Sequence, residues 1–511
     1  MGKGIRSQAL QLARGMSIRC RHFAASPHGN VAIIFGLCLL PLLMAAGVAI
    51  DLSRALIVRE RLGHTLDTAA LAVGSKLGLT DDQRQAMVQE FFAANYPPSA
   101  LGTPKDIQIA ADTTTVTASA AADVPTTILQ LFGYDVLTVA ADVAVTRQLT
   151  RLEVVMILDN TGSMAGSKIA ALKTAASDLV NILSEDSPPG YLKFALVPFA
   201  NAVNVGTQAL AKGWIDSNAQ SDIAGENFTS PPKAKVLDLY DKIPNRSWNG
   251  CIEERKPPYD LSDDAPTAGN ANTLWLPYFA PDEPNLSGYS NSYLPDGISG
   301  TADQRQRYLG KYNNVNAASG LGPLSGCTVA PITPLTGDKS AILNAVASMG
   351  ADGNTHIPIG IAWGRRVLSP GEPYTEGVAY DAVDWKKAAI ILTDGDNTIA
   401  ATSNHNKSRY SAYGYLANGR LGTTNASTFE SKLDEKTALA CTELKSAGKD
   451  AGGQGVEVFT ITFNVTNSGI KTLMRNCASS DANYFNSPSN SELQAAFRAI
   501  ASALSNLRLS K

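Results

Sequence analysis

One carboxylate and two hydroxyl side chains alternate along a short stretch in the first third of the chain. Asp159, Thr161 and Ser163 directly follow an apolar run at 154–158. A short β-branched run that ends in turn residues is typical of a buried strand that stops at a loop. Oxygen atoms at alternate positions can face the same way, and hard oxygen ligands suit Mg²⁺ or another hard divalent cation. The spacing makes this loop a candidate metal site, although Asp-x-Thr-x-Ser by itself is a common pattern.

Two further pieces of sequence strengthen this hypothesis. A second apolar run, at 388–392, leads into Thr393 and Asp394 and predicts another buried strand with a carboxylate at its end. Between the two runs, Thr355 stands just before the apolar segment 357–367. In a parallel α/β sheet, ligands bind beyond the carboxyl ends of the strands. We therefore expect these side chains to gather at one edge of a sheet.

The order of these motifs resembles the von Willebrand factor A domain and its metal-ion-dependent adhesion site. The chain has a strand with Asp-x-Thr-x-Ser, a helix, Gly-x-Thr, and a second strand with Thr-Asp-Gly-x-Asn. The resemblance implies that Thr161, Ser163 and Thr355 bind the metal directly. It also implies that Asp159 and Asp394 hold the metal, Mg²⁺ or else Mn²⁺ or Ca²⁺, largely through waters. The family usually has serine where this chain has Thr161, so we expect metal binding with an altered affinity.

The composition excludes some classes of protein. The 511 residues are enough for two or three domains, and 43 Lys and Arg against 46 Asp and Glu give no basic excess for nucleic acid. The sequence has no Walker P-loop, no HExxH or GxSxG motif, and no nucleophile with an identifiable base. His356 is expected to be an exposed loop histidine. We therefore predict a binding protein and not an enzyme.

The N-terminus predicts a membrane anchor. Residues 1–29 contain five Lys or Arg and no acidic residue, and an uncharged apolar run follows at 31–50. As a helix this run is about 30 Å long, which is enough to span a bilayer. The basic flank favours a cytoplasmic N-terminus. A cleaved signal peptide and an organellar presequence are the alternatives, but the run is long for a signal core.

The apolar run continues into a stalk that resembles a pilus family. Leucine, alanine and valine follow at helical spacing up to Val73, and no proline interrupts the sequence from residue 52 to 96. The segment from Asn30 through Asp51 to Ala72 resembles the N-terminal part of TadE/TadG-like proteins of Flp (tight adherence) pilus assembly. It lacks the glycine followed five residues later by glutamate that prepilin peptidase substrates have, which argues against that processing. A plain membrane anchor is the alternative.

This resemblance implies a location and a partner. It implies a single-pass protein of the bacterial inner membrane, with a cytoplasmic N-terminus and a periplasmic C-terminal domain. It also implies a metal-dependent, protein-binding component of Flp/Tad pilus assembly. Such a component would bind pilus subunits or other assembly proteins through an acidic side chain at the metal. The alternatives are a surface adhesin whose A domain binds an external ligand, and a metal-dependent hydrolase.

We expect four regions along the chain. They are a basic cytoplasmic tail at 1–29, the membrane helix and stalk at 30–77, a small α/β unit at 80–148, and the A-like domain at 150–511. Alternating strands and helices in the last region predict a doubly wound, mostly parallel α/β sheet. Two insertions into it, at about 204–335 and 399–428, are rich in Trp and Tyr. These aromatic residues form either the insertions' own core or a recognition surface.

Four cysteines follow the predicted span, at positions 251, 327, 441 and 477. They allow three pairings, and we favour Cys251–Cys327 with Cys441–Cys477 because each pair falls within one structural region. Disulfides agree with export to an oxidising periplasm. None of the four forms a CxxC pair, which argues against metal ligation. Isolated buried thiols are the alternative.

Overall fold

The computed structural model describes residues 29–76, 79–96, 102–112, 115–146, 150–185 and 187–509. The predicted basic tail, apart from residue 29, lies outside the described residues. The chain divides into two compact units, residues 1–147 and 148–511. Each unit is described by itself below.

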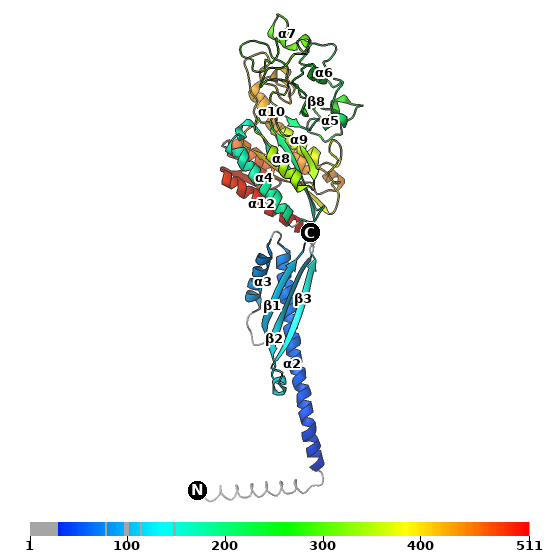
Figure 1. Ribbon diagram of the computed structural model, residues 1–511, viewed down its shortest axis with the longest axis vertical. Coiled ribbons are helices and arrows are strands. Elements are labelled where there is room, and N and C mark those ends of the chain that lie inside the picture. Colours follow the sequence, from blue (N-terminus) through cyan, green and yellow to red (C-terminus); the bar gives the residue numbers. More distant parts are fainter. Residues whose placement is uncertain are drawn as a thin grey trace. The chain divides into compact units, whose positions relative to one another are not determined.

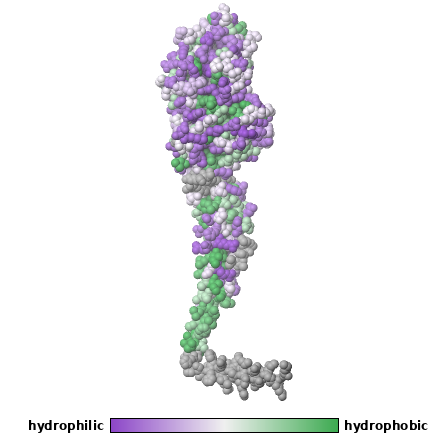
Figure 2. Space-filling model, turned by 180° about the vertical axis from the view of Figure 1, so that it is seen from behind, coloured by the Kyte–Doolittle hydropathy of each residue, from purple (hydrophilic) through white to green (hydrophobic). Residues whose placement is uncertain are grey.

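The first unit is built on one long helix, α2 (Gly29–Gly74), which continues through Pro41. Among the described residues it is the one helix that is long and apolar enough to cross a membrane. Residues 31–50 of this helix are apolar and, apart from Gly47, exposed, and Figure 2 shows a narrow hydrophobic column there. The helix therefore contains the predicted candidate anchor.

The second half of α2 packs against the rest of the first unit (Figure 1). The partners are the helix α3 (Asp81–Asn95) and an antiparallel sheet of β1 (Thr103–Ala111), β2 (Thr115–Pro125) and β3 (Val136–Thr146). Leu62 and Leu66 of α2 share one core with Phe92 of α3 and with Ala118 of β2. The second half of α2, α3 and the antiparallel sheet thus share one core within the first unit.

The second unit contains a six-stranded sheet in the order β12-β11-β10-β4-β5-β9. All neighbouring strands are parallel except β5 and β9, which are antiparallel. The strands are β4 (Arg151–Asp159), β5 (Leu192–Phe199), β9 (Thr333–Thr336), β10 (Trp385–Thr393), β11 (Val456–Phe463) and β12 (Tyr484–Ser487). Because the chain builds outward from β4 in both directions, the sheet is doubly wound and mostly parallel, as predicted.

Helices cover both faces of this sheet. One face carries α4 (Ser167–Glu185), α8 (Lys339–Ser348) and α12 (Asn490–Leu509), and α4 lies beside α12 (Figure 1). The other face carries α9 (Ile357–Leu368), α10 (Ala426–Ser446) and α11 (Ser468–Cys477). Successive side chains of a strand point to opposite faces. Accordingly Met156 and Leu158 of β4 lie in the first core, whereas Val155 and Ile157 lie in the second.

Two long segments extend from the sheet, residues 200–332 between β5 and β9 and residues 394–425 between β10 and α10. The first contains a small antiparallel sheet and three short α-helices. These elements are β6 (Val203–Asn204), β7 (Cys251–Glu253), β8 (Leu276–Pro277), α5 (Gln208–Ala211), α6 (Val236–Asp241) and α7 (Ala302–Arg307).

The aromatic residues of these segments are mostly buried. The buried ones are Trp214, Phe228, Tyr240, Trp248, Trp275, Tyr278, Phe279, Tyr293, Tyr312, Tyr410, Tyr413 and Tyr415. Tyr278 and Tyr410 join the two segments, with their ring centroids 5.3 Å apart. Of the two interpretations of these residues, the structure supports a core, which is continuous with the core on the α9 face of the main sheet. A recognition surface is excluded for the buried residues.

Both favoured disulfides are formed, and the alternative of isolated thiols is wrong for these four cysteines. Cys251 is bonded to Cys327 within the segment 200–332. Cys441 is bonded to Cys477, which joins α10 to α11.

Candidate metal site

Two adjacent parallel strands bring two carboxylates to one edge of the sheet. β4 ends at Asp159, and Asp394 directly follows the end of β10. Leu158 lies opposite Leu392 in the register of these strands, so both carboxylates stand at their carboxyl ends. Asp159 is fully buried, and Asp394 is nearly so. The sheet therefore places the two acidic residues of the predicted site together.

A continuous chain of hydrogen bonds joins four of the predicted site residues. Asp159 Oδ1 accepts hydrogen bonds from the backbone N–H and the hydroxyl of Thr161, at 2.9 and 2.6 Å. The hydroxyls of Thr161 and Ser163 are 3.0 Å apart, and Ser163 donates to Asp394 Oδ1 at 2.6 Å. The short 3₁₀ helix η2 (Gly162–Met164) turns the backbone so that both hydroxyls face the carboxylates. The spacing of the first motif thus has the predicted effect.

The surroundings of the buried Asp159 side chain disfavour its charged form. Its second oxygen, Oδ2, accepts hydrogen bonds from the Thr393 hydroxyl at 2.8 Å and the Asp394 N–H at 3.4 Å. Burial, and then the nearby charge of Asp394, raise the pKa of Asp159 to about 6, although the hydrogen bonds from Thr161 and Thr393 act to lower it. A cation at this position would favour the charged form of Asp159.

The loop that carries Thr355 lies against the first motif. The Gly353 carbonyl accepts a hydrogen bond from Gly162 N–H at 3.0 Å. Gly353 has a φ of +83°, and a Cβ there would lie 2.6 Å from Asn201 Oδ1, so glycine is required. Thr355 itself is buried, and its N–H donates to the Thr398 hydroxyl at 3.3 Å. The backbone of this loop thus reaches the site, whereas the side-chain hydrogen bonds described above join the other four predicted ligands to one another.

Lys168 is a site residue that the sequence analysis misses. Its ammonium group lies 2.7 Å from Asp394 Oδ2, and its side chain is about one-quarter exposed. Lys168 is the second residue of α4, where the positive end of the helix dipole disfavours a cation. Lys168 stands five residues after Ser163, and a lysine in the first turn of a helix is a signal that could have pointed to an acidic partner.

The donor set fits a hard divalent cation. Within the described ranges no group of three or more His, Cys, Asp or Glu side chains occurs, so a metal here would be held by hydroxyls and two carboxylates. Such oxygen ligands suit Mg²⁺, Mn²⁺ or Ca²⁺ and do not suit soft metals.

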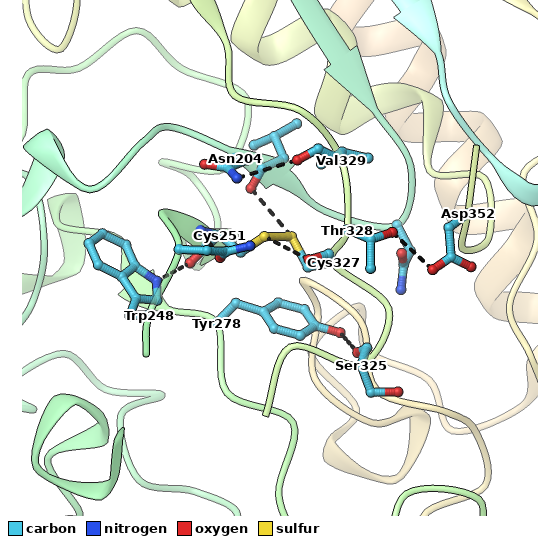
Figure 3. Close-up of a disulfide and its surroundings, with 12 residues drawn as sticks. Asn204, Trp248, Cys251, Tyr278, Ser325, Cys327, Thr328, Val329 and Asp352 are labelled. Carbon is cyan, nitrogen blue, oxygen red and sulfur yellow. Dashed lines mark hydrogen bonds between the residues drawn. A yellow bond between two sulfur atoms is a disulfide. The ribbon is translucent and has the colours of Figure 1, made fainter. Parts of the chain in front are cut away.

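A disulfide is linked to the loop that precedes Thr355 (Figure 3). Thr328, the residue after Cys327, donates a hydrogen bond from its hydroxyl to Asp352 Oδ2 at 2.9 Å. The Asp352 N–H in turn donates to the Asn160 carbonyl at 2.9 Å, inside the first motif. The Cys251–Cys327 bond therefore helps to hold the 350–355 loop beside the carboxylates.

His356 differs from the expectation of an exposed loop histidine. Its side chain is fully buried, with ring centroids 5.8 Å from Tyr413 and 6.0 Å from Phe429. Burial lowers the pKa of His356 to about 3, so the ring is neutral. It belongs to the core behind the Thr355 loop, because Tyr413 and Phe429, from distant parts of the sequence, fold over it.

The N-terminal segment matches a known family. Residues 29–76 match the family model described as putative Flp pilus-assembly TadE/G-like. These residues form α2 and the two positions after it. No curated protein matches the chain.

Solved structures are similar to the chain only at a distance. The pilus adhesin SpaC from Lactobacillus rhamnosus GG is 12% identical with a TM-score of 0.31, and the match covers 78% of this chain and 34% of SpaC. The chain thus spans about a third of that protein. The vWF domain of the type V pili tip protein Mfa5 from Porphyromonas gingivalis is 12% identical with a TM-score of 0.33. The match covers 71% of this chain and 97% of the Mfa5 domain. Proximal thread matrix protein 1 from the mussel byssus, with a zinc-occupied MIDAS motif, is 13% identical with a TM-score of 0.28. The match covers 71% of this chain and 47% of that protein.

Proposed function

We propose that this chain is a membrane-anchored, metal-dependent protein-binding component of Flp/Tad pilus assembly. The TadE/G-like segment at 29–76 supports the connection to pilus assembly. The observation that carries the binding role is the hydrogen-bonded chain from Asp159 through Thr161 and Ser163 to Asp394. It stands at the carboxyl ends of adjacent parallel strands, where such sheets bind ligands.

In this proposal five residues hold a divalent cation, Mg²⁺ or else Mn²⁺ or Ca²⁺. Thr161, Ser163 and Thr355 bind it directly, and Asp159 and Asp394 bind it largely through waters. Because the direct ligands are neutral hydroxyls, a bound cation supplies a coordination position for an acidic side chain of a partner. The partner is a pilus subunit or another assembly protein, and the site's role is recognition and not catalysis.

Lys168 competes with the cation for Asp394. Its ammonium group forms an ion pair with Asp394 Oδ2 and balances part of the negative charge at the site. A cation and an ammonium group that share one carboxylate repel each other, so cation binding favours a Lys168 side chain turned away from Asp394. The lysine thereby weakens metal binding and keeps the site ordered without metal.

We also propose that this site lies outside the cytoplasm. In the proposal α2 crosses the bacterial inner membrane once, residues 1–29 are cytoplasmic, and residues 80–511 are periplasmic. The two disulfides support this orientation because such bonds persist in oxidising compartments.

The test uses the full-length chain in its own host. Membranes from cells that express wild type or the Asp159→Ala, Asp394→Ala or Thr161→Val variant are incubated with Mg²⁺ or with EDTA and are then crosslinked. We expect capture of a pilus component by wild type in Mg²⁺, and its loss with EDTA and in all three variants. Thr161→Ser, which keeps the hydroxyl, is the matched control and should retain capture.

Pilus assembly is scored in the same strains by electron microscopy. Pili at wild-type numbers in the two alanine variants, at normal protein levels, would refute the assembly role. Exposure of the C-terminal unit to protease on intact cells would instead favour a surface adhesin that binds an external ligand.

A further inference from the structure

The loop between β2 and β3 exposes a cluster of apolar side chains. Residues 126–135 contain the 3₁₀ helix η1 (Leu129–Phe132). Leu131 is 77% exposed, Phe132 is 44% exposed and Tyr134 is 64% exposed. These three side chains lie within four residues of sequence, and we call them the apolar tip.

This loop is fixed to α2 by a buried carboxylate. Asp51 is 2% exposed, and its side chain accepts hydrogen bonds from the backbone N–H groups of Thr127, Ile128 and Leu129, each at 2.9 Å. The Arg54 guanidinium donates a further hydrogen bond to the Thr127 hydroxyl. Three N–H groups that would otherwise lack partners at the start of η1 are thereby satisfied. The apolar tip therefore has a defined position along α2.

That position is the end of the apolar run. Ile128 sits directly on Gly47, where a Cβ would lie 2.3 Å from the Ile128 Cγ2 atom, so glycine allows the close approach. Gly47 belongs to the apolar run 31–50, and Asp51 is the first charged residue after it. The two contacts are four residues apart, about 6 Å along a helix axis. The loop thus meets α2 across the boundary between its apolar and polar parts.

We propose that the apolar tip is a second membrane contact, which enters the bilayer interface beside the outer end of α2. The occupant is lipid, because the neighbouring surface of α2 is itself exposed and apolar through residue 46 and continues to the tip. Tyrosine and other aromatic side chains concentrate at the level of the headgroups. Membrane contact at both the helix and the loop would fix the direction of the stalk. This inference depends on the proposed anchoring by α2 and not on the metal site.

The test measures lipid contact at single positions of the full-length chain in nanodiscs. Cys20 and Cys38 are replaced by serine, and the two disulfides are kept oxidised. An environment-sensitive nitrobenzoxadiazole label is then attached to Leu131→Cys. The matched controls are Leu40→Cys in the apolar run, 63% exposed, and Val383→Cys in the second unit, 88% exposed. The nanodiscs hold one chain each and contain either ordinary or spin-labelled phosphatidylglycerol and phosphatidylethanolamine.

We expect a blue-shifted emission from the label at residue 131, because the apolar tip lies at the membrane interface. Lipid that is spin-labelled at the headgroup should quench this label. The quenching should be at least about half as strong as the quenching of the label at residue 40 by lipid that is spin-labelled in the acyl chain. The label at residue 383 should stay unquenched. Asp51→Ala should release the loop and lower the quenching at residue 131 without changing residue 40.

The outcomes separate this inference from the anchor itself. If residue 40 is quenched and residue 131 is not, α2 is in the membrane and the apolar tip is in water, which overturns the inference. A blue shift at residue 131 without lipid quenching also overturns it, because a protein surface then covers the tip. If residue 40 is unquenched as well, the anchoring by α2 fails together with the inference.

Discussion

Replacement of Asp159 by asparagine should stabilise the second unit when no metal is bound. The pKa of Asp159 is raised from 3.8 to about 6, first by burial and second by the charge of Asp394. Each pKa unit corresponds to about 1.4 kcal/mol, so the charged carboxylate costs the folded state about 3 kcal/mol at pH 7.5 relative to the neutral form. Asparagine is uncharged and has nearly the same shape, so it avoids this cost.

Part of the gain is lost because an amide cannot replace every hydrogen bond of the carboxylate. Asp159 Oδ2 accepts from the Thr393 hydroxyl and from the Asp394 N–H. An amide NH₂ at that position can donate to the hydroxyl but faces the N–H donor, which costs about 1 kcal/mol. We therefore expect a net stabilisation of about 1–2 kcal/mol by Asp159→Asn at pH 7.5. The Asp159 carboxylate would thus lower the stability of the metal-free protein while it serves metal binding, which is a trade-off between stability and function.

The assay is urea unfolding of residues 148–511 in EDTA at pH 4.5, 6 and 7.5. Because the folded-state pKa of Asp159 is raised, its cost is absent below about pH 3.8 and develops as the pH rises through about 6. The advantage of the asparagine variant should therefore grow from pH 4.5 to pH 7.5. His356, whose pKa is lowered to about 3, titrates in both proteins and cancels in the difference.

The reasoning is refuted if Asp159→Asn destabilises the unit by the same amount at all three pH values. That result would mean that the carboxylate is charged and well compensated by its hydrogen bonds without any metal. An asparagine variant that gains stability and also retains a thermal shift with Mg²⁺ would instead contradict the assignment of Asp159 to the metal.

Two further predictions concern the surroundings of the site. Lys168→Gln removes the ammonium group from Asp394 and should raise the affinity for Mg²⁺ roughly tenfold, because a competing positive charge is lost. A lower affinity by calorimetry would show that the lysine supports the metal. Loss of the Cys251–Cys327 disulfide should destabilise the unit by about 4 kcal/mol and weaken Mg²⁺ binding roughly tenfold, since it holds the 350–355 loop. Loss of the Cys441–Cys477 disulfide is the matched control, and equal effects of both on Mg²⁺ binding would exclude a special link to the site.

The two carboxylates of the site could be predicted from the sequence because each stands at the end of a strand. The apolar runs at 154–158 and 388–392 each lead to a carboxylate, and parallel strands bring such ends together. The loop geometry follows from the alternation of Asp159, Thr161 and Ser163, which needs no knowledge of the rest of the fold. Local sequence is sufficient where the strand and its own loop decide the geometry.

The remaining features depend on contacts between distant segments. β9 has the sequence Thr-Pro-Leu-Thr and no apolar alternation, so only its pairing with β5 reveals it as a strand. Lys168 reaches a carboxylate 226 residues away, and its place in the first turn of α4 is a local signal that does not identify this partner. His356 is buried by Tyr413 and Phe429, and aromatic composition does not distinguish a core from a surface. Each of these features needs the tertiary structure.

The most direct test of the metal site is a calorimetric titration of Mg²⁺ and Mn²⁺ into residues 148–511 with both disulfides formed. The account predicts one bound cation for the parent and none for Asp159→Ala or Asp394→Ala, with all three proteins folded by circular dichroism. A folded parent that binds neither cation would contradict the account, since Asp159, Thr161, Ser163 and Asp394 would then form a closed hydrogen-bonded cluster without a metal.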